Sequence, residues 1–304
     1  IRRPDGYVGK PPSLGTDVFA MATGNSSSTI PSFTSNFPVD FVFNKQPAST
    51  SNWEVMARLI QGKWLKTNAS DAEASYSDAT FDSNIGCISN SGYTSNNQAY
   101  MWKRHAGFDV QTYTGISGAD THAHQMGVTP EMIWVKARNN SSDDWCVGHK
   151  DLTGGFTGSI LYLNSTSAEV TSNQFGQAPT STHWSNASGG LTNEDGRHYI
   201  ALLFASVDGI SKVGYYDGSN SSQTITTGFQ PRFVIIKSTT ANYPWQVLDT
   251  TRGWGSGDDK VLYLNGANAQ ASHDYGAPTS TGFTLTSSDY YNISGEKFIY
   301  YAHA

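Results

Sequence analysis

The sequence has little charge. Only 14% of its 304 residues are charged, and the net charge is −6. Neighbouring basic residues occur only as the pairs Arg2-Arg3 and Lys103-Arg104. Because nucleic-acid binding proteins present a clustered basic face, we expect no nucleic-acid partner.

Long apolar runs and cysteines are scarce as well. The longest apolar run, Tyr199 to Val207, is far shorter than the roughly 20 residues that span a bilayer, so we expect no membrane insertion. Cys87 and Cys146 are isolated, which favours two buried thiols over a disulfide framework or a zinc site. Residue 1 is Ile, and no signal-like segment follows, so we expect a processed chain or part of a longer one.

What replaces the charge is Ser, Thr, Asn and Gly, together with 12% aromatic residues. Disordered chains lack aromatics, so this composition favours a folded protein. Thr, Tyr, Phe and Val favour strands, and Asn, Gly and Ser favour turns. The composition is typical of a β-rich extracellular or virion protein.

Two widely separated segments are nearly the same. Residues 160–169 read ILYLNSTSAE, and residues 261–270 read VLYLNGANAQ. Around both, a Lys-terminated apolar run, a Trp-x-Val step, an APTST segment and a closing apolar run recur in one order. A weaker copy, with WLKTN in place of ILYLN, precedes them. The repeated landmarks are Trp53, Trp145 and Trp245, with Asn68, Asn164 and Asn265.

The ordered landmarks predict three units. We expect them at about 14–106, 107–206 and 207–304, after a Pro/Gly-rich lead at 1–13. Each has the size of an immunoglobulin-like sandwich and is large enough for a small core of its own. No flexible linker separates the units, so we expect them to keep a fixed mutual orientation.

Within a unit, apolar residues follow strand periodicity. Met132 to Val135 is apolar on both faces, as in a strand covered on both sides. In each Trp-x-Val step the two side chains share one face, which we expect to be the core side. The predicted fold is therefore all-β, with three tandem β-sandwich-like units that abut closely. The best helical candidate is Glu54 to Gln61.

A set of these landmarks resembles a repeat unit of tailed-phage virion proteins, found in tail fibres and related structural proteins of marine and cyanobacterial phages. The motifs are GFDVxTYTG (107–115), PxMIxVK (130–136), WxV (145–147), LYLN (161–164) and APTST (178–182). The first copy departs from the pattern at Lys66 and Thr67. The resemblance implies a virion surface protein built of β-sandwich units, and it implies no catalytic residues.

One candidate metal site is His122-Ala123-His124, since both imidazoles would point to one side of a strand. Trimeric phage fibres can use such pairs, three chains together, to bind an iron or similar ion. The positions we match to it, 30–32 and 224–226, hold no histidine. That contrast favours exposed strand histidines over a metal site.

Carboxylate pairs are the route to glycosidase chemistry. Glu73, Glu169 and Gln270 occupy one repeat position, and the third has lost its acid, which favours a turn or surface role. Neither a nucleophile elbow nor a phosphate-binding glycine loop is present. We expect no enzyme activity and no cofactor.

Five aromatic residues stand in polar, loop-like surroundings and are candidates for stacking on a sugar ring. They are Tyr215, Tyr216, Trp254, Tyr290 and Tyr291. In a strand doublet, one ring faces the core and the other faces out. Packing against a neighbouring unit or subunit explains such residues equally well.

The sequence thus favours a non-enzymatic virion structural protein, of tail-fibre or adhesin type, on the particle surface. Its expected partners are other virion proteins, further copies of itself with a trimer as the first expectation, and a host-surface polysaccharide. Three alternatives stay open: a capsid decoration protein, a secreted carbohydrate-binding protein and a tailspike depolymerase.

Overall fold

The computed structural model describes residues 12–255, 257–287 and 290–304. The predicted lead at 1–13 lies almost wholly outside these residues. Within them the chain forms antiparallel sheets, and its only helical elements are short 3₁₀ turns. These turns are η1 (Gly15–Asp17), η2 (Arg58–Ile60), η3 (Gly155–Thr157), η4 (Gly190–Thr192), η5 (Thr250–Arg252) and η6 (Tyr290–Asn292). The prediction of an all-β fold is confirmed.

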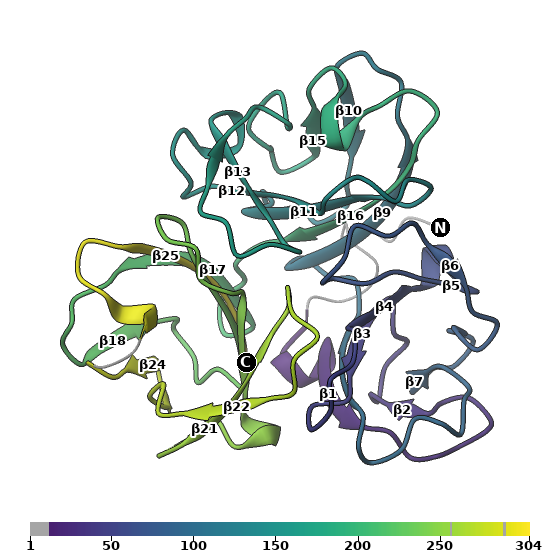
Figure 1. Ribbon diagram of the computed structural model, residues 1–304. Coiled ribbons are helices and arrows are strands. Elements are labelled where there is room, and N and C mark those ends of the chain that lie inside the picture. Colours follow the sequence, from purple (N-terminus) through teal and green to yellow (C-terminus); the bar gives the residue numbers. More distant parts are fainter. Residues whose placement is uncertain (1–11, 256, 288–289) are drawn as a thin grey trace.

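Figure 1 shows three lobes arranged around a common centre. We call the part from β1 to β8 (19–102) lobe 1, from β9 to β16 (108–204) lobe 2, and from β17 to β25 (211–303) lobe 3. Lobe 1 is purple to blue, lobe 2 is teal and lobe 3 is green to yellow (Figure 1). Tight backbone pairing at the joints, between His105 and Phe108 and between Val207 and Ser211, replaces any linker.

Each lobe has one large sheet, and its strands follow the same order. In lobe 2 the order is β14 (Val170–Thr171), β13 (Ser159–Tyr162), β12 (Cys146–His149), β11 (Met132–Ala137), β16 (His198–Phe204) and β9 (Phe108–Thr114). In lobe 3 it is β22 (Ala271–His273), β21 (Asp259–Tyr263), β20 (Gln246–Asp249), β19 (Phe233–Ser238), β25 (Lys297–His303) and β17 (Ser211–Asp217). In lobe 1 it is β4 (Glu54–Ala57), β3 (Phe41–Lys45), β8 (Gln98–Trp102) and β1 (Phe19–Thr23).

Smaller sheets complete each lobe. Lobe 1 has β2 (Phe33–Thr34) with β7 (Gly86–Cys87), and β5 (Lys63–Trp64) with β6 (Ala74–Ser75). Lobe 2 has β10 (Asp120–Ala123) with β15 (His183–Asn186). Lobe 3 has β18 (Gln223–Thr226), β24 (Gly282–Leu285) and β23 (Pro278–Thr279). Each lobe is therefore a two-layered, sandwich-like body.

The largest core is shared by the three lobes. In β3, Phe41 and Phe43 point to a central cluster, and Val42 points to an outer cluster within lobe 1. The central cluster also holds the matching residues of lobes 2 and 3, so that the inner faces of all three large sheets pack on one another. Rings meet across the lobes, as in the Trp134–Trp245 contact at 6.4 Å. Each lobe therefore has an outer core of its own, as expected, but it also shares the central core with the other two lobes.

The helix expected at Glu54 to Gln61 is wrong. The segment forms strand β4 and then the turn η2. Val55 and Ala57 face the central cluster and Met56 faces the outer cluster of lobe 1, so burial alternates with the period of a strand. Trp53 starts this alternation, on the central side.

The repeated asparagine holds the repeated tryptophan inside each lobe. The amide oxygen of Asn164 accepts a hydrogen bond from the Trp145 backbone N–H at 3.0 Å. Asn68 accepts from Trp53 at 3.0 Å and Asn265 accepts from Trp245 at 2.7 Å. The three tryptophans are buried, as the Trp-x-Val pattern predicts.

The tryptophan indoles link the lobes into a closed ring. Trp145 Nε1 donates to the Lys66 carbonyl of lobe 1 at 2.7 Å, and Trp245 Nε1 donates to the Tyr162 carbonyl of lobe 2 at 2.9 Å. Trp53 Nε1 donates to the carbonyl of Tyr263 in lobe 3 at 2.7 Å, which closes the ring. Because a carbonyl accepts each bond, the side chain at this position is free to differ, and Lys66 replaces tyrosine in lobe 1.

The segments that follow these carbonyls act as arms between lobes. We call 66–73, 162–169 and 263–270 the arms. Each ends in a backbone N–H that donates to a carbonyl of the neighbouring lobe. The pairs are Glu73 with Arg138, Glu169 with Thr239, and Gln270 with Pro47, at 2.6, 2.8 and 2.7 Å. The backbone makes this contact, so loss of the acid at the third position does not break the pattern.

A buried lysine lies at the same place in every lobe. Burial lowers the pKa of Lys45 and Lys136 to about 8 and that of Lys237 to about 7. All three ammonium groups donate to backbone carbonyls. Lys45 reaches Ala267 and Lys237 reaches Thr166, both on the arm of another lobe. Lys45 and Lys237 therefore help to hold the ring together, whereas Lys136 donates to Ala137 and Asn140 within lobe 2.

Asn164→Ala is expected to lower the free energy of unfolding by about 1–3 kcal/mol, because it leaves the N–H of the buried Trp145 without its acceptor. Urea titration followed by tryptophan fluorescence measures the change. Asn268→Ala, at an exposed position on the lobe 3 arm, is the control and should change stability by less than about 0.5 kcal/mol. Equal effects of both substitutions would refute the role given to Asn164.

Candidate functional site

A polar groove of about 500 Å³ lies beside lobe 2, at its junction with lobe 1. One wall is β9, the edge strand of the large sheet, and the other is β10 of the small sheet. We define the groove by six of the residues that line it: Leu59, Arg104, Asp109, Gln111, His122 and Gln125. Its volume lies within the range of small-molecule sites.

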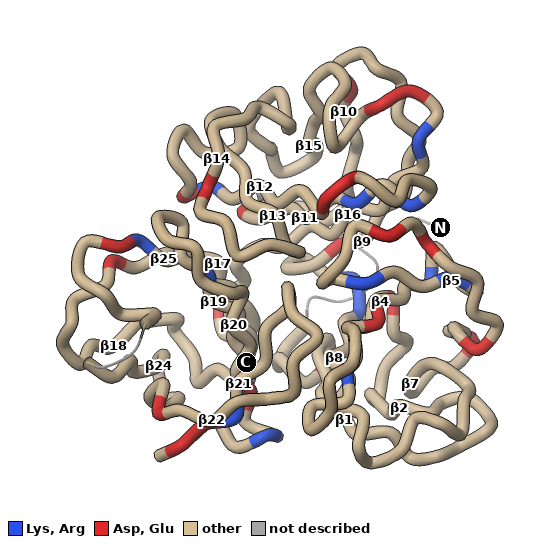
Figure 2. Tube along the Cα trace, viewed as in Figure 1, with Lys and Arg blue, Asp and Glu red and all other residues tan. Residues whose placement is uncertain are grey.

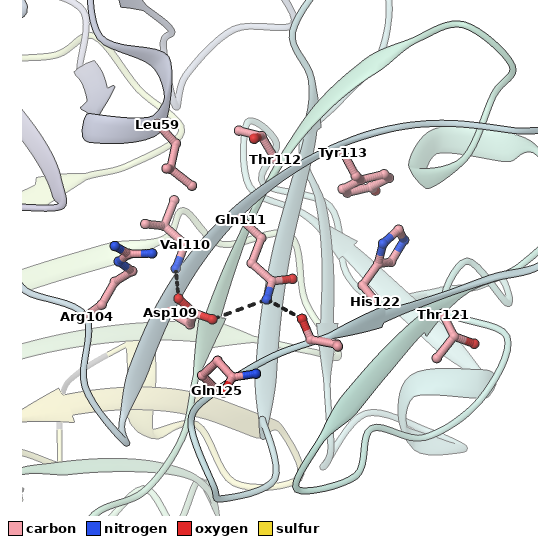
Figure 3. Close-up of a pocket in the computed structure, with 11 residues that line it drawn as sticks. Leu59, Arg104, Asp109, Val110, Gln111, Thr112, Tyr113, Thr121, His122 and Gln125 are labelled. Carbon is pink, nitrogen blue, oxygen red and sulfur yellow. Dashed lines mark hydrogen bonds between the residues drawn. The ribbon is translucent and has the colours of Figure 1, made fainter. Parts of the chain in front are cut away.

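Gln111 lies in the middle of the residues that line the groove (Figure 3). Its amide nitrogen donates to Asp109 Oδ2 at 3.2 Å and to the Ala123 carbonyl at 2.9 Å. Its oxygen accepts from Trp184 Nε1 at 2.9 Å. This one side chain therefore joins the two sheets of lobe 2, and three hydrogen bonds fix its orientation.

Charge in the groove is nearly balanced. Asp109 is buried, and burial raises the pKa of its carboxyl to about 6, although the positive charge of Arg104 and two hydrogen bonds oppose the rise. Figure 3 shows Arg104 and Asp109 at one end of the groove, with Tyr113 and His122 at the other. Above pH 6, one cation and one anion therefore face a mainly polar surface.

His122 is held between aromatic rings. Its imidazole lies 4.3 Å from the Tyr113 ring and 4.5 Å from the Trp184 ring, centre to centre. Asn186 Nδ2 is 2.8 Å from its Nε2. Burial lowers the pKa of His122, while the charge of Asp120 works in the opposite direction. The ring is therefore neutral near pH 7.

The expectation of two exposed strand histidines is wrong. His124 is buried just after β10, where Nε2 is 3.0 Å from the Thr180 carbonyl and Nδ1 accepts from Met126 N–H at 3.3 Å. Burial also lowers the pKa of His124. In the part of the chain that the structure describes, no three His, Cys, Asp or Glu side chains are grouped to hold a metal ion.

Three of the five candidate sugar-stacking residues are buried. Tyr216, Trp254 and Tyr291 are 6%, 3% and 3% exposed and belong to the outer cluster of lobe 3. Tyr215 and Tyr290 are exposed at 50% and 65%. Each doublet therefore places one ring inside and one outside, whereas the polar neighbours of Trp254 wrongly indicated exposure.

Two further acids, Asp143 and Asp259, have local partners. The Asp143 carboxylate is bound to Arg197, and Asp259 accepts from the N–H groups of Gly255 and Tyr275. Cys87 and Cys146 are free and buried, as expected. Local contacts therefore account for the Asp143 and Asp259 carboxylates.

Charge is thinly spread over the rest of the molecule. Figure 2 shows acidic and basic residues singly or in short runs along the trace. None of the helical elements in the described ranges is long and apolar enough to cross a membrane.

Comparison with known families gives a match over much of the chain. A family model described as a domain of unknown function (DUF7483) covers residues 102–304, about two thirds of the chain. The chain belongs to the DUF7483 family. The DUF7483 region contains the whole of lobes 2 and 3 and the groove strands β9 and β10. A search of the curated proteins finds no match.

Sequence reasoning missed Asp109 and Gln111. A signal for Gln111 was present, because it is a polar residue at a repeat position where lobe 3 has Gly214. Finding that match requires the strand register, because the β9 and β17 segments share few residues. The groove therefore became visible only in three dimensions.

Proposed function

We propose that this DUF7483 protein is a non-enzymatic structural protein of a tailed-phage virion, on a tail fibre or another exposed site. Its work is assembly with other virion proteins and attachment to a host-surface glycan. Assembly into a homo-oligomer, with a trimer as the first expectation, belongs to the same proposal.

The observation that carries the proposal is the closed ring of lobes with a polar groove beside lobe 2. Indole, lysine and arm contacts tie the lobes together, so the body provides a rigid support with few exposed charges. The groove lies at the junction of lobes 1 and 2. A rigid support with a localised polar groove fits a protein that presents a binding surface on a particle.

The experiment is to locate the chain on purified virions by immunogold electron microscopy. We expect gold at the tail or its fibres. Gold on the head would favour a capsid decoration protein, and absence of the chain from virions would overturn the proposal in favour of a secreted carbohydrate-binding protein. Light scattering of the purified chain measures the oligomeric state.

The depolymerase alternative has one observation in its favour. Asp109 is a buried carboxyl group in a polar groove, and its raised pKa is typical of a general acid. We expect no reducing sugar to be released from host polysaccharide. Release that Asp109→Asn abolishes would overturn the non-enzymatic assignment.

A further inference from the structure

The groove of lobe 2 stands where lobe 3 is filled. Ile200 pairs with Lys136, and Ile299 pairs with Lys237. Because the two lysines hold the same repeat position, Ile200 of lobe 2 matches Ile299 of lobe 3. The residues that follow them, Ala201 and Tyr300, therefore match as well. Gln111 pairs with Ala201, and Gly214 pairs with Tyr300. The pair Gln111/Ala201 of lobe 2 thus replaces the pair Gly214/Tyr300 of lobe 3.

Tyr300 fills this position in lobe 3. Its side chain is 4% exposed, and its hydroxyl lies 3.5 Å from the Thr226 carbonyl of the small sheet. A Cβ added at Gly214 would lie 2.8 Å from the Tyr300 ring, so the glycine makes room for the phenol. Gln111 makes the corresponding bond to Ala123 in lobe 2, but an amide is smaller than a phenol ring.

The second wall differs in the same way. His122 pairs with Trp184, and Ile225 pairs with Phe283. His122 therefore matches Ile225, one residue away from the match made by sequence alone. Lobe 3 shows that this fold is built with an apolar residue here. The polar residues of lobe 2 are thus not a requirement of the fold.

The backbone of β9 also contributes to the groove. Gly115 N–H donates to the Arg197 carbonyl, and Ala205 N–H donates to the Gly107 carbonyl. The odd-numbered residues of β9 therefore point their backbone N–H and C=O groups toward β16. In an antiparallel edge strand the alternate residues point their N–H and C=O groups away from the sheet. Thr112, which lines the groove, therefore directs its backbone donor and acceptor toward it.

We propose that this groove binds a neutral oligosaccharide, with the second lone pair of the Gln111 amide oxygen, the Thr112 backbone and Arg104 as hydrogen-bonding groups and Leu59 as an apolar contact for a sugar ring. This inference rests on the proposed attachment to a glycan and names the site. Amide, guanidinium and backbone groups suit the alternating donors and acceptors of sugar hydroxyls. Leu59 is 43% exposed, so it offers apolar surface beside them.

A neutral ligand fits the charges of the groove better than an acidic one. Arg104 is held by Asp40, 3.4 Å from its Nε, and Asp109 lies in the same groove. An acidic saccharide would meet that second carboxylate without a free cation to match it. A peptide adding to β9 as an extra strand is the competing occupant.

The test is titration calorimetry of the full chain with five probes: cellotetraose, maltotetraose, chitotetraose, mannotetraose and the acidic tetragalacturonate. We expect at least one neutral tetrasaccharide to bind. A filled variant, Gln111→Gly with Ala201→Tyr and Trp184→Phe, copies lobe 3 and should weaken that binding at least tenfold. Trp184→Phe is included because the glycine removes the acceptor of the Trp184 indole.

Ile85→Ala is the matched control, because Ile85 is exposed on lobe 1 outside the groove. It should bind as tightly as the wild type. Full affinity in a folded, filled variant, preference for tetragalacturonate, or no binding of any neutral probe would overturn the inference. Gold on the tail together with any of these results would leave the virion assignment standing, so the two failures are distinguishable.

Discussion

Trp245→Ala is expected to lower the free energy of unfolding of the whole chain by about 3–5 kcal/mol. Trp245 is buried in the central cluster, contacts Trp134 of lobe 2, and donates to the Tyr162 carbonyl. The substitution opens a cavity where three sheets meet and also removes one link of the ring. Because the core is shared, the loss should reach all three lobes.

Hydrogen exchange followed by mass spectrometry shows which strands lose stability in the Trp245→Ala variant. We expect the slowest-exchanging amides of β3, β11 and β19 to lose protection together. Trp245→Phe keeps most of the ring volume and removes the donor, so it should cost less than Trp245→Ala. Faster exchange confined to lobe 3 would contradict a shared core.

Acid is expected to unfold the protein steeply below pH 6. Burial lowers the pKa of His105 and His149 to about 3 and holds that of His303 well below its ordinary value. His149 Nδ1 lies 3.8 Å from the Asp151 carboxylate. It also accepts a hydrogen bond from the Asp151 N–H. An accepting Nδ1 carries no proton and the ring is neutral, so the contact with the carboxylate is not an ion pair.

The direction of this pH dependence comes from proton binding. Below pH 6.5 the unfolded chain protonates these histidines while the folded chain keeps them neutral, so their contribution is present above pH 6.5 and lost as the pH falls. Each group costs about 1.4 kcal/mol per pH unit, so three groups cost about 8 kcal/mol between pH 6.5 and 4.5. That loss is comparable with the whole stability of a typical domain. Burial also raises the pKa of Asp109 and of Asp259, and these two groups work in the opposite direction to the three histidines.

Urea titrations at half-unit steps from pH 7.5 to 4.5 measure this slope. His149→Asn keeps an acceptor near Nδ1 and removes the titrating ring, so it should reduce the slope by about one third of the histidine contribution. A stability that stays flat between pH 7 and 5 would refute the account of these histidines.

Local pattern was enough to predict much of the fold. The buried Trp-x-Val faces and the all-β class follow from alternation within a few residues, which a single sequence displays directly. The helix expected at Glu54 to Gln61 failed because its apolar residues suit either period over so short a length. Val55 and Met56 point to opposite sides of the segment, which is the pattern of a strand and not of a helix. Both side chains are buried because lobe 1 has a separate core on each side of its large sheet.

Contacts between lobes were beyond the sequence. The Lys66 carbonyl accepts the Trp145 indole whatever its side chain is, so a backbone role leaves little trace in residue identity. The same holds for the arm N–H of Gln270. These positions looked like a weakened copy or a lost acid, although the structure gives each the same contact in every lobe.

The groove was hidden for a different reason. Lobes 2 and 3 differ in which of two paired strands carries the larger side chain. In lobe 2 the larger residue, Gln111, pairs with Ala201, whereas in lobe 3 the larger residue, Tyr300, pairs with Gly214. The two members of each pair lie far apart in the chain. A sequence comparison that treats positions singly does not detect an exchange of volume across a sheet.

Three lobes that share one core should fold and unfold as one body. Differential scanning calorimetry of the full chain at pH 7.5 tests this central claim most directly. We predict one transition, with a calorimetric enthalpy equal to the van't Hoff enthalpy to within about 10%. Two or three resolved transitions, or a calorimetric enthalpy two to three times the van't Hoff value, would show lobes that unfold independently and would contradict it.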